Sequence, residues 1–321
     1  MTCANGTDAP ARPHGVGRRA GRCGARPDSR SSRAGRRRRS GATPVFVDVD
    51  ERTFNLDAAK LEEAVRFVER ETDLVPRVVV AVDLFGLPAD YPAIRKVCER
   101  HGLLLLEDGA QGFGGSIDGK MACSFGDVST TSFFPAKPLA ATATAARCCR
   151  LDEWAELVRS YAVHGKELDE VRQRARGREQ PPRHAPGGGA AGEARRVRGR
   201  AGRRERGGCP LLGALAESGL ALPEVPEGYR SSWAQYTVRL PEGLDRDALQ
   251  AALKERGVPT MVYYPKPMHG QGAFEGAHLC PDGCPVTKRL CETVLSLPMG
   301  PYLTADEVLS AVHFIDKWLV E

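Results

Sequence analysis

Two ionisable side chains in the first half of this 321-residue chain combine types and positions that could do chemistry. Asp108 lies in Glu-Asp-Gly-Ala-Gln, directly after a run of four leucines, and Lys137 lies in Phe-Phe-Pro-Ala-Lys-Pro. An amine that condenses with an aldehyde and a carboxylate that keeps a ring nitrogen protonated are what a pyridoxal phosphate site needs. The pair favours that cofactor. On the residues alone, a helix-capping aspartate and a surface lysine stay open as alternatives.

The elements that must position these residues follow a strand–helix–strand pattern. Residues 77–83 have the composition of a buried strand, 91–101 that of a helix, and the leucine run ends a second strand at Asp108. A third strand, 128–134, leads to Lys137. Such a pattern is typical of α/β sheets, which place their chemistry at the carboxyl ends of strands. We therefore expect Asp108 and Lys137 at neighbouring strand ends.

Three segments in this region resemble a known family. They are Glu107-Asp-Gly-Ala-Gln-Gly-Phe-Gly114, Ser124-Phe-Gly-Asp127 and Thr131-Ser-Phe-Phe-Pro-Ala-Lys-Pro-Leu139. In register, they look very like the DegT/DnrJ/StrS family of sugar aminotransferases that depend on pyridoxal phosphate. The resemblance implies fold type I of the pyridoxal phosphate enzymes, with a large mixed-sheet α/β domain, 1–220, and a small carboxyl-terminal α/β domain, 221–321. It also implies a homodimer with composite active sites.

The same resemblance assigns roles on the cofactor side. Lys137 would be the catalytic lysine that forms the Schiff base, and Asp108 the partner of the pyridine nitrogen. Gln111 would lie near the phenolic oxygen of the ring, and Ser132 would hydrogen-bond the phosphate. The family usually has alanine where this chain has Gly109.

Further site residues are implied near the two ends of the chain. Gly6 and Thr7 resemble a family segment that holds the cofactor phosphate at a helix start. Residues 258–269 resemble a loop that lies near the sugar nucleotide in such enzymes, which makes Tyr263, Tyr264 and His269 predicted substrate-binding residues. Half-buried strand packing is the alternative interpretation of the tyrosines. The resemblance covers residues 1–9, 41–139, 151–170 and 210–321.

Elsewhere the spacing of apolar residues predicts the remaining elements. The predicted helices are 58–70, 151–161, 210–220, 246–256, 286–294 and 305–320, and the predicted strands are 41–50, 231–239 and the first part of 258–269.

The formal net charge of +5 comes from two segments. Residues 10–40 hold eleven arginines and one acid, and residues 172–208 hold twelve arginines and three acids; the rest of the chain has 23 basic and 37 acidic residues. Neither segment has enough apolar surface to offset chain entropy, so both are predicted to be disordered. They could be nucleic-acid-binding arms, but the lack of interleaved aromatic residues disfavours nucleic acid as a partner.

A shift of reading frame explains these segments better. With degenerate codons moved by one base, residues 14–27, 140–149 and 172–194 can each spell a family segment, the second being the glycine loop after the lysine. We infer that the chain is the conceptual translation of a gene with compensating frameshifts. Two hypotheses follow, an aminotransferase and an inactive frameshifted product.

Composition also sets expectations for compartment, metal and substrate. No apolar run is long enough to span a membrane and no signal peptide follows Met1, so a cytoplasmic protein is expected. Cys280, Cys284, Cys291 and His278 lack the spacing of a zinc motif, so no metal is expected. By resemblance, the amino group passes from an amino acid, expected to be glutamate, to a nucleotide-linked keto sugar. The motifs are most similar to members that act on 3-keto sugars of UDP-N-acetyl-hexuronic type, in glycan biosynthesis.

Overall fold

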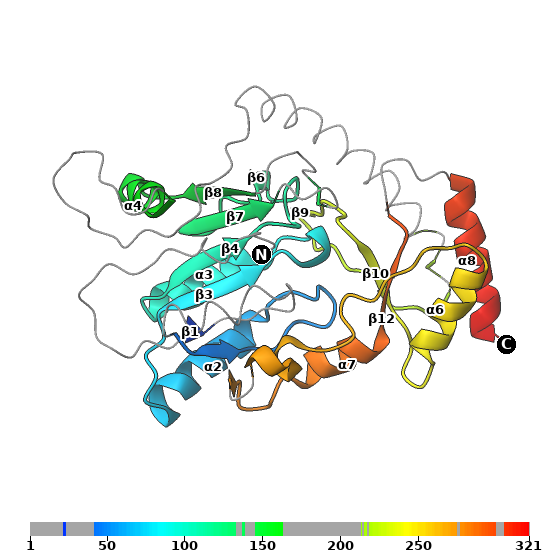
Figure 1. Cartoon of the computed structure of the whole chain (residues 1–321), viewed down its shortest axis with the longest axis horizontal. Coiled ribbons are helices and arrows are strands. Elements are labelled where there is room, and N and C mark those ends of the chain that lie inside the picture. The colour runs from blue at the N-terminus through cyan, green and yellow to red at the C-terminus, as the bar shows by residue number, and fades with distance from the viewer. Residues whose placement is uncertain are drawn as a thin grey trace, which may run out of the picture.

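A mixed four-stranded sheet forms the centre of the computed structural model (Figure 1). The structure describes residues 22–23, 42–132, 137–138, 145–162, 213, 215–216, 218–274, 277–299 and 305–320. The strand order is β3–β4–β7–β8, in which β3, β4 and β7 are parallel and β8 is antiparallel to β7. The bounds are β3 Val78–Val82, β4 Leu104–Asp108, β7 Val128–Ser132 and β8 Ala145–Cys149. The predicted α/β class is confirmed, and β8 is a strand that the sequence analysis did not predict.

The helices beside this sheet begin where the sequence predicts. Asp57 caps α2, Ala58–Glu71, by accepting from the backbone N–H groups of Ala59 and Lys60. Asp90 caps α3, Tyr91–Arg100, in the same way. The buried residues of both helices recur at helical spacing and join the core around β3 and β4. They are Leu61, Ala64, Val65 and Val68 of α2, and Tyr91, Ile94, Val97 and Cys98 of α3. Helix α4, Asp152–Ala162, follows β8.

A second core lies at the other end of the molecule (Figure 1). Strands β10, Tyr236–Arg239, and β12, Val294–Leu297, form an antiparallel pair, beside which lie α6, Arg246–Glu255, and α8, Ala305–Val320. Strand β10 is shorter than the predicted strand 231–239. In the predicted strand at the start of 258–269, only Met261 pairs, in an isolated bridge to Ser296. The domain boundary at 220 stays a prediction.

Two small sheets connect distant parts of the chain. Strand β2, Pro44–Phe46, pairs in parallel with β1, Arg22–Cys23, and with β11, His278–Leu279. Strand β5 pairs with β6 and β9. Helix α7 follows β11, so the carboxyl-terminal half returns to the first core. The remaining bounds are β5 Ser116–Ile117, β6 Lys120–Met121, β9 Tyr229–Arg230, α7 Pro285–Thr293, and the short helices η1 Leu84–Gly86, η2 Met268–Gly270 and η3 Gly272–Phe274.

Two expectations need correction. Arg22 and Cys23 form a strand, so the prediction of disorder over 10–40 is wrong at these two residues. The predicted helix 210–220 is wrong at 215–216 and 218–219, which form turns and bends. The rest of 10–40 and all of 172–208 lie outside the described residues. Among the helices that the structure does describe, none is long and apolar enough to cross a membrane.

Candidate active site at the carboxyl ends of the parallel strands

Asp108 is the last residue of β4, and its side chain is fully buried. Its register partner on β7 is Thr130. Because side chains alternate between the two faces of a strand, Ser132 at the end of β7 shares the face of Asp108. The backbone N–H of Ala110 donates to Asp108 Oδ1 at 3.3 Å. The structure therefore places two predicted cofactor residues on one face of the sheet, at the same edge.

Glu107 points to the opposite face and organises a loop. Its carboxylate accepts from the backbone N–H groups of Cys123, Phe125 (2.8 Å) and Gly126 (3.1 Å) and from Ser129 Oγ (2.7 Å). Four donors suit a buried carboxylate. Glu107 holds the turn before β7 against β4, a role that the sequence analysis missed although its position next to Asp108 implied the other face.

Asp83 directly follows β3 and is also fully buried. Its Oδ1 accepts from the hydroxyl of Tyr91 at 2.7 Å and from the backbone N–H of Ala89 at 3.2 Å. Burial raises the pKa of Asp83 well above its usual range, and the charge of Glu107 raises it further. A Cβ on Gly112 would lie 2.0 Å from Asp83 Oδ2, so the turn after β4 rests on this side chain. Asp83 was not predicted from the sequence.

The structure explains why position 109 holds glycine and not alanine. A Cβ there would lie 2.5 Å from the Sγ of Cys123, far inside contact distance. The Cys123 side chain thus takes the space that an alanine methyl group would need. Thr131 Oγ1 also donates to the carbonyl of Gly109 at 3.3 Å. Gly109 and Cys123 therefore form a complementary pair behind Asp108.

Gln111 connects the end of β4 to a segment more than a hundred residues away. Its Oε1 accepts from the backbone N–H of Phe85 at 2.6 Å, and its backbone carbonyl accepts from Ser232 Oγ at 2.6 Å. The first bond fixes the orientation of the carboxamide and leaves its NH₂ group as the donor end. The short helix that contains Phe85 is held from the other side by Gln235, whose N–H donates to the carbonyl of Phe85 at 3.2 Å.

Lys137 is half-buried in the structure. The stretch 133–136, which leads to it from Ser132, lies outside the described residues, as do Gly6 and Thr7. Asp108 offers a buried carboxylate for a protonated ring nitrogen, Gln111 a donor for an oxygen, and Ser132 a hydroxyl on the same face. This donor set fits pyridoxal phosphate.

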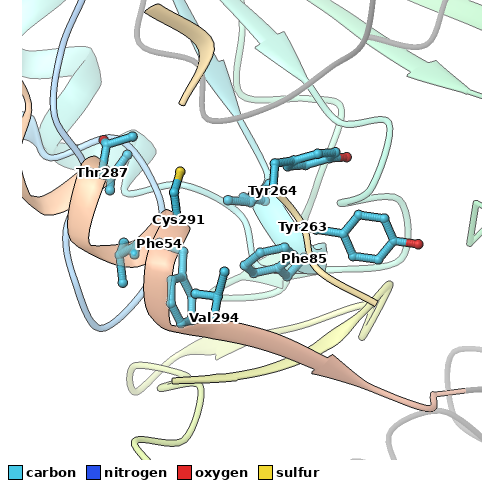
Figure 2. A pocket seen from close by; sticks show the side chains of 10 residues that line it. Phe54, Phe85, Tyr263, Tyr264, Thr287, Cys291 and Val294 are labelled. Carbon is cyan, nitrogen blue, oxygen red and sulfur yellow. The ribbon is translucent and has the colours of Figure 1, made fainter. Parts of the chain in front are cut away.

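A small, partly open cavity of about 30 Å³ lies between η1 and α7 (Figure 2). Two aromatic pairs contribute to it, with ring centroids 5.3 Å apart in each: Phe54 with Phe85, and Tyr263 with Tyr264. Figure 2 shows both tyrosine hydroxyls pointing away from α7. The predicted tyrosines therefore meet aromatic residues that were not predicted. The lining residues are Val49, Phe54, Leu84, Phe85, Tyr263, Tyr264, Thr287, Leu290, Cys291 and Val294.

His269 is not among the residues that line this cavity. Its ring lies 6.0 Å from the ring of Phe46. Burial lowers the pKa of His269, and the charge of Lys288 lowers it further, while Asp48 opposes both. His269 thus lies outside the lining of this cavity, and its role in substrate binding stays a prediction. Of the residues that the structure describes, no three or more histidine, cysteine and acidic side chains gather as a metal site would require.

Comparison with protein families gives a match over most of the chain. The model of the DegT/DnrJ/EryC1/StrS aminotransferase family matches residues 33–185 and 196–316. One similar protein is UDP-N-acetyl-3-dehydro-alpha-D-glucosamine 3-aminotransferase of Acidithiobacillus ferrooxidans, 35% identical over 87% of this chain and 72% of the relative. Another is UDP-2-acetamido-2-deoxy-3-oxo-D-glucuronate aminotransferase of Pseudomonas aeruginosa, 35% identical over 82% of this chain and 70% of the relative.

Solved structures agree with this match. A DegT DnrJ EryC1 StrS aminotransferase from Brucella abortus superposes with a TM-score of 0.85 at 33% identity, over 99% of this chain and 85% of its own. DesV of S. venezuelae, solved in complex with a ketimine intermediate, superposes with a TM-score of 0.82 at 27% identity, over 94% of this chain and 79% of its own. These likenesses confirm the predicted fold, type I of the pyridoxal phosphate enzymes.

Proposed function

Because the chain belongs to the DegT/DnrJ/EryC1/StrS aminotransferase family, whose cofactor is pyridoxal phosphate, we propose that it moves an amino group from glutamate to a nucleotide-linked 3-keto sugar. The observation that carries the substrate class is the pair of relatives at 35% identity, both named for UDP-linked sugars with a 3-dehydro or 3-oxo group. The identity of the amino donor, the identity of the sugar and a role in glycan biosynthesis go beyond membership of the family.

On the cofactor side, each role follows from the chemistry of the side chain. Pyridoxal phosphate, when bound, supplies an electron sink for the bond changes at the amino-bearing carbon. The buried carboxylate of Asp108 holds a positive ring nitrogen, and the NH₂ group of Gln111 donates to a ring oxygen. Ser132 bonds the phosphate, with Gly6 and Thr7 as its further partners. Lys137 would supply the amine that attaches the cofactor and would move a proton at the amino-bearing carbon.

On the substrate side, the aromatic cavity offers apolar walls and two hydroxyl groups. Apolar pockets with a few placed polar groups are the usual form of small-molecule sites. We assign Tyr263 and Tyr264 to contact with the sugar nucleotide, and His269 to support of the same loop from its place against Phe46. In this proposal the protein is a cytoplasmic homodimer in which residues 1–220 bind the cofactor and 221–321 form the small domain.

The test is a direct assay of the full chain with pyridoxal phosphate, ¹⁵N-glutamate and a set of keto sugars linked to UDP or dTDP. We expect ¹⁵N to appear on carbon 3 of a UDP-linked 3-keto sugar, with one 2-oxoglutarate formed for each amine. Turnover of dTDP-linked sugars alone would overturn the substrate class. If neither the loaded literal chain nor the loaded frame-corrected chain aminates any of these sugars, the function is overturned.

The second hypothesis, an inactive product, rests on the three segments that match the family in a shifted frame. Apart from residues 22–23 and 145–149, those segments lie outside the described residues, so the nucleotide sequence decides. A frame-corrected chain expressed beside the literal one should bind the cofactor as a coloured dimer. If the literal chain alone fails to turn over, the family function stands and the frameshifts account for the loss.

A further inference from the structure

Two cysteines in the carboxyl-terminal half face each other. The Sγ atoms of Cys280 and Cys284 lie 3.2 Å apart, and the residues are only 3% and 1% exposed. A tight turn brings them together, because the N–H of Gly283 donates to the carbonyl of Cys280 at 2.9 Å. Disulfide-bonded sulfurs are about 2.05 Å apart. A movement of about 1 Å, within the reach of side-chain rotation, therefore separates this pair from a covalent bond.

The surroundings make one sulfur the better nucleophile. The thiol of Cys284 hydrogen-bonds the sulfur of Cys280 and thereby lowers the pKa of Cys280, while the pKa of Cys284 is raised by the same bond. Asp282 opposes this effect from 2.9 Å, but the ammonium of Lys60 lies 3.0 Å from that carboxylate. Because the thiolate is the reactive form of cysteine, Cys280 is the attacking member of the pair.

The turn is fixed at both ends to β2 and the residues that follow it. The N–H of Cys280 donates to the carbonyl of Phe46 at 2.8 Å. Helix α7 begins directly after Cys284, and its first turn is held by the buried Asp48, which accepts from the N–H groups of Val286 and Thr287 at 2.8 Å each. The same helix contributes Thr287, Leu290 and Cys291 to the aromatic cavity.

We propose that Cys280 and Cys284 are a thiol-modification site that closes to a reversible disulfide in the presence of hydrogen peroxide. The Cys280 thiolate attacks one peroxide oxygen, the O–O bond breaks, and one water leaves. The Cys284 sulfur then displaces the second water from the Cys280 sulfenic acid as the S–S bond forms. Two thiols are oxidised and one peroxide is reduced to two waters; a small thiol restores both cysteines by exchange.

The test uses the full chain with its cofactor, treated with graded peroxide, then unfolded, alkylated and digested with trypsin. Lys266 precedes a proline, so both cysteines fall in the single peptide 257–288. We expect that peptide to lose two hydrogens and to resist alkylation, and to recover after dithiothreitol. Cys280→Ser and Cys284→Ser should each abolish the bridge.

Cys98 of α3 is the internal control, because it is as buried as the pair and its pKa is raised to about 12. The pair should oxidise at least about tenfold faster than Cys98. Equal rates would overturn the proposal, and so would sulfinic acid on Cys280 with no bridge. The measurement on the unsubstituted chain decides by itself if the serine variants do not fold.

Discussion

The cofactor side and the aromatic cavity are built in different ways. Around Asp108 the buried carboxylate of Glu107 alone receives four hydrogen bonds, while Thr130 Oγ1 and Asp83 Oδ2 are buried without a hydrogen-bond partner. Around Tyr263 the walls are apolar rings and aliphatic side chains from separate parts of the chain. Charge stabilisation needs donors and acceptors fixed in place, whereas recognition of a large substrate needs shape. On this contrast we propose that chemistry belongs to the first region and substrate selection to the second.

The largest expected effect separates two buried aspartates at neighbouring strand ends. Asp108→Asn should lower kcat about 100- to 1000-fold, because a neutral amide cannot hold a positive ring nitrogen. Asp83→Asn should cause a far smaller loss, because burial raises the pKa of Asp83 and favours its neutral form, and an amide has the same shape. Steady-state kinetics on both variants measures this. Equal losses would erase the distinction between the two carboxyl groups.

The next largest effect is expected on stability, at Gly86, where the turn after β3 packs on the segment 232–234. Gly86 has φ +108°, and a Cβ there would lie 2.5 Å from Ser232 Oγ and 2.9 Å from the Trp233 nitrogen. Gly86→Ala should therefore cost about 1–2 kcal/mol for the backbone conformation and about 1–3 kcal/mol for the overlap. Gly102→Ala is the matched control, with φ +61° and nothing within 4 Å. Urea unfolding should rank Gly86→Ala well below the control; the reverse order would mean that Ser232 and Trp233 do not pack on this turn.

Substitutions in the aromatic cavity should change KM for the sugar nucleotide. Tyr263→Phe and Tyr264→Phe keep the rings and remove the hydroxyls, so we expect KM for the sugar nucleotide to rise about five- to tenfold with little change in kcat. Tyr229→Phe is the control, because its hydroxyl bonds Asp90 elsewhere, at 3.4 Å. A fall in kcat without a change in KM would show that the tyrosine hydroxyls act in the chemical step and not in substrate binding.

The smallest expected change is in the pH dependence of stability. The pKa of Asp83 is raised in the folded chain. Its contribution to the free energy of unfolding is therefore fully present below the ordinary aspartate pKa, and it is lost as pH rises toward the pKa of the folded chain. Asp83→Asn removes that loss. Its Tm should exceed that of the parent at pH 7 to 8, and the difference should shrink toward pH 4. A difference that grows on acidification would show that Asp83 is ionised when folded.

The sequence predicted one region better than the other, for physical reasons. Asp108, Gln111 and Ser132 lie within one short stretch, and strand alternation and register place Asp108 and Ser132 on one face of the sheet. Asp83 and Glu107 were missed because their roles come from burial and from a loop that closes over them. The aromatic cavity was beyond sequence patterns, since Phe54, Phe85 and α7 meet only after the carboxyl-terminal half folds back. His269 was predicted as a substrate-binding residue; its ring lies 6.0 Å from that of Phe46, and its role stays a prediction.

The most direct measurement is borohydride reduction of the cofactor-loaded chain, followed by peptide mapping. If Asp108, Gln111 and Ser132 form the cofactor site with Lys137 as its covalent partner, the pyridoxyl group will be found on Lys137, and Lys137→Arg will carry none. A stable label on Lys120 or Lys266 instead, or bound cofactor that borohydride attaches to no lysine, would contradict this account.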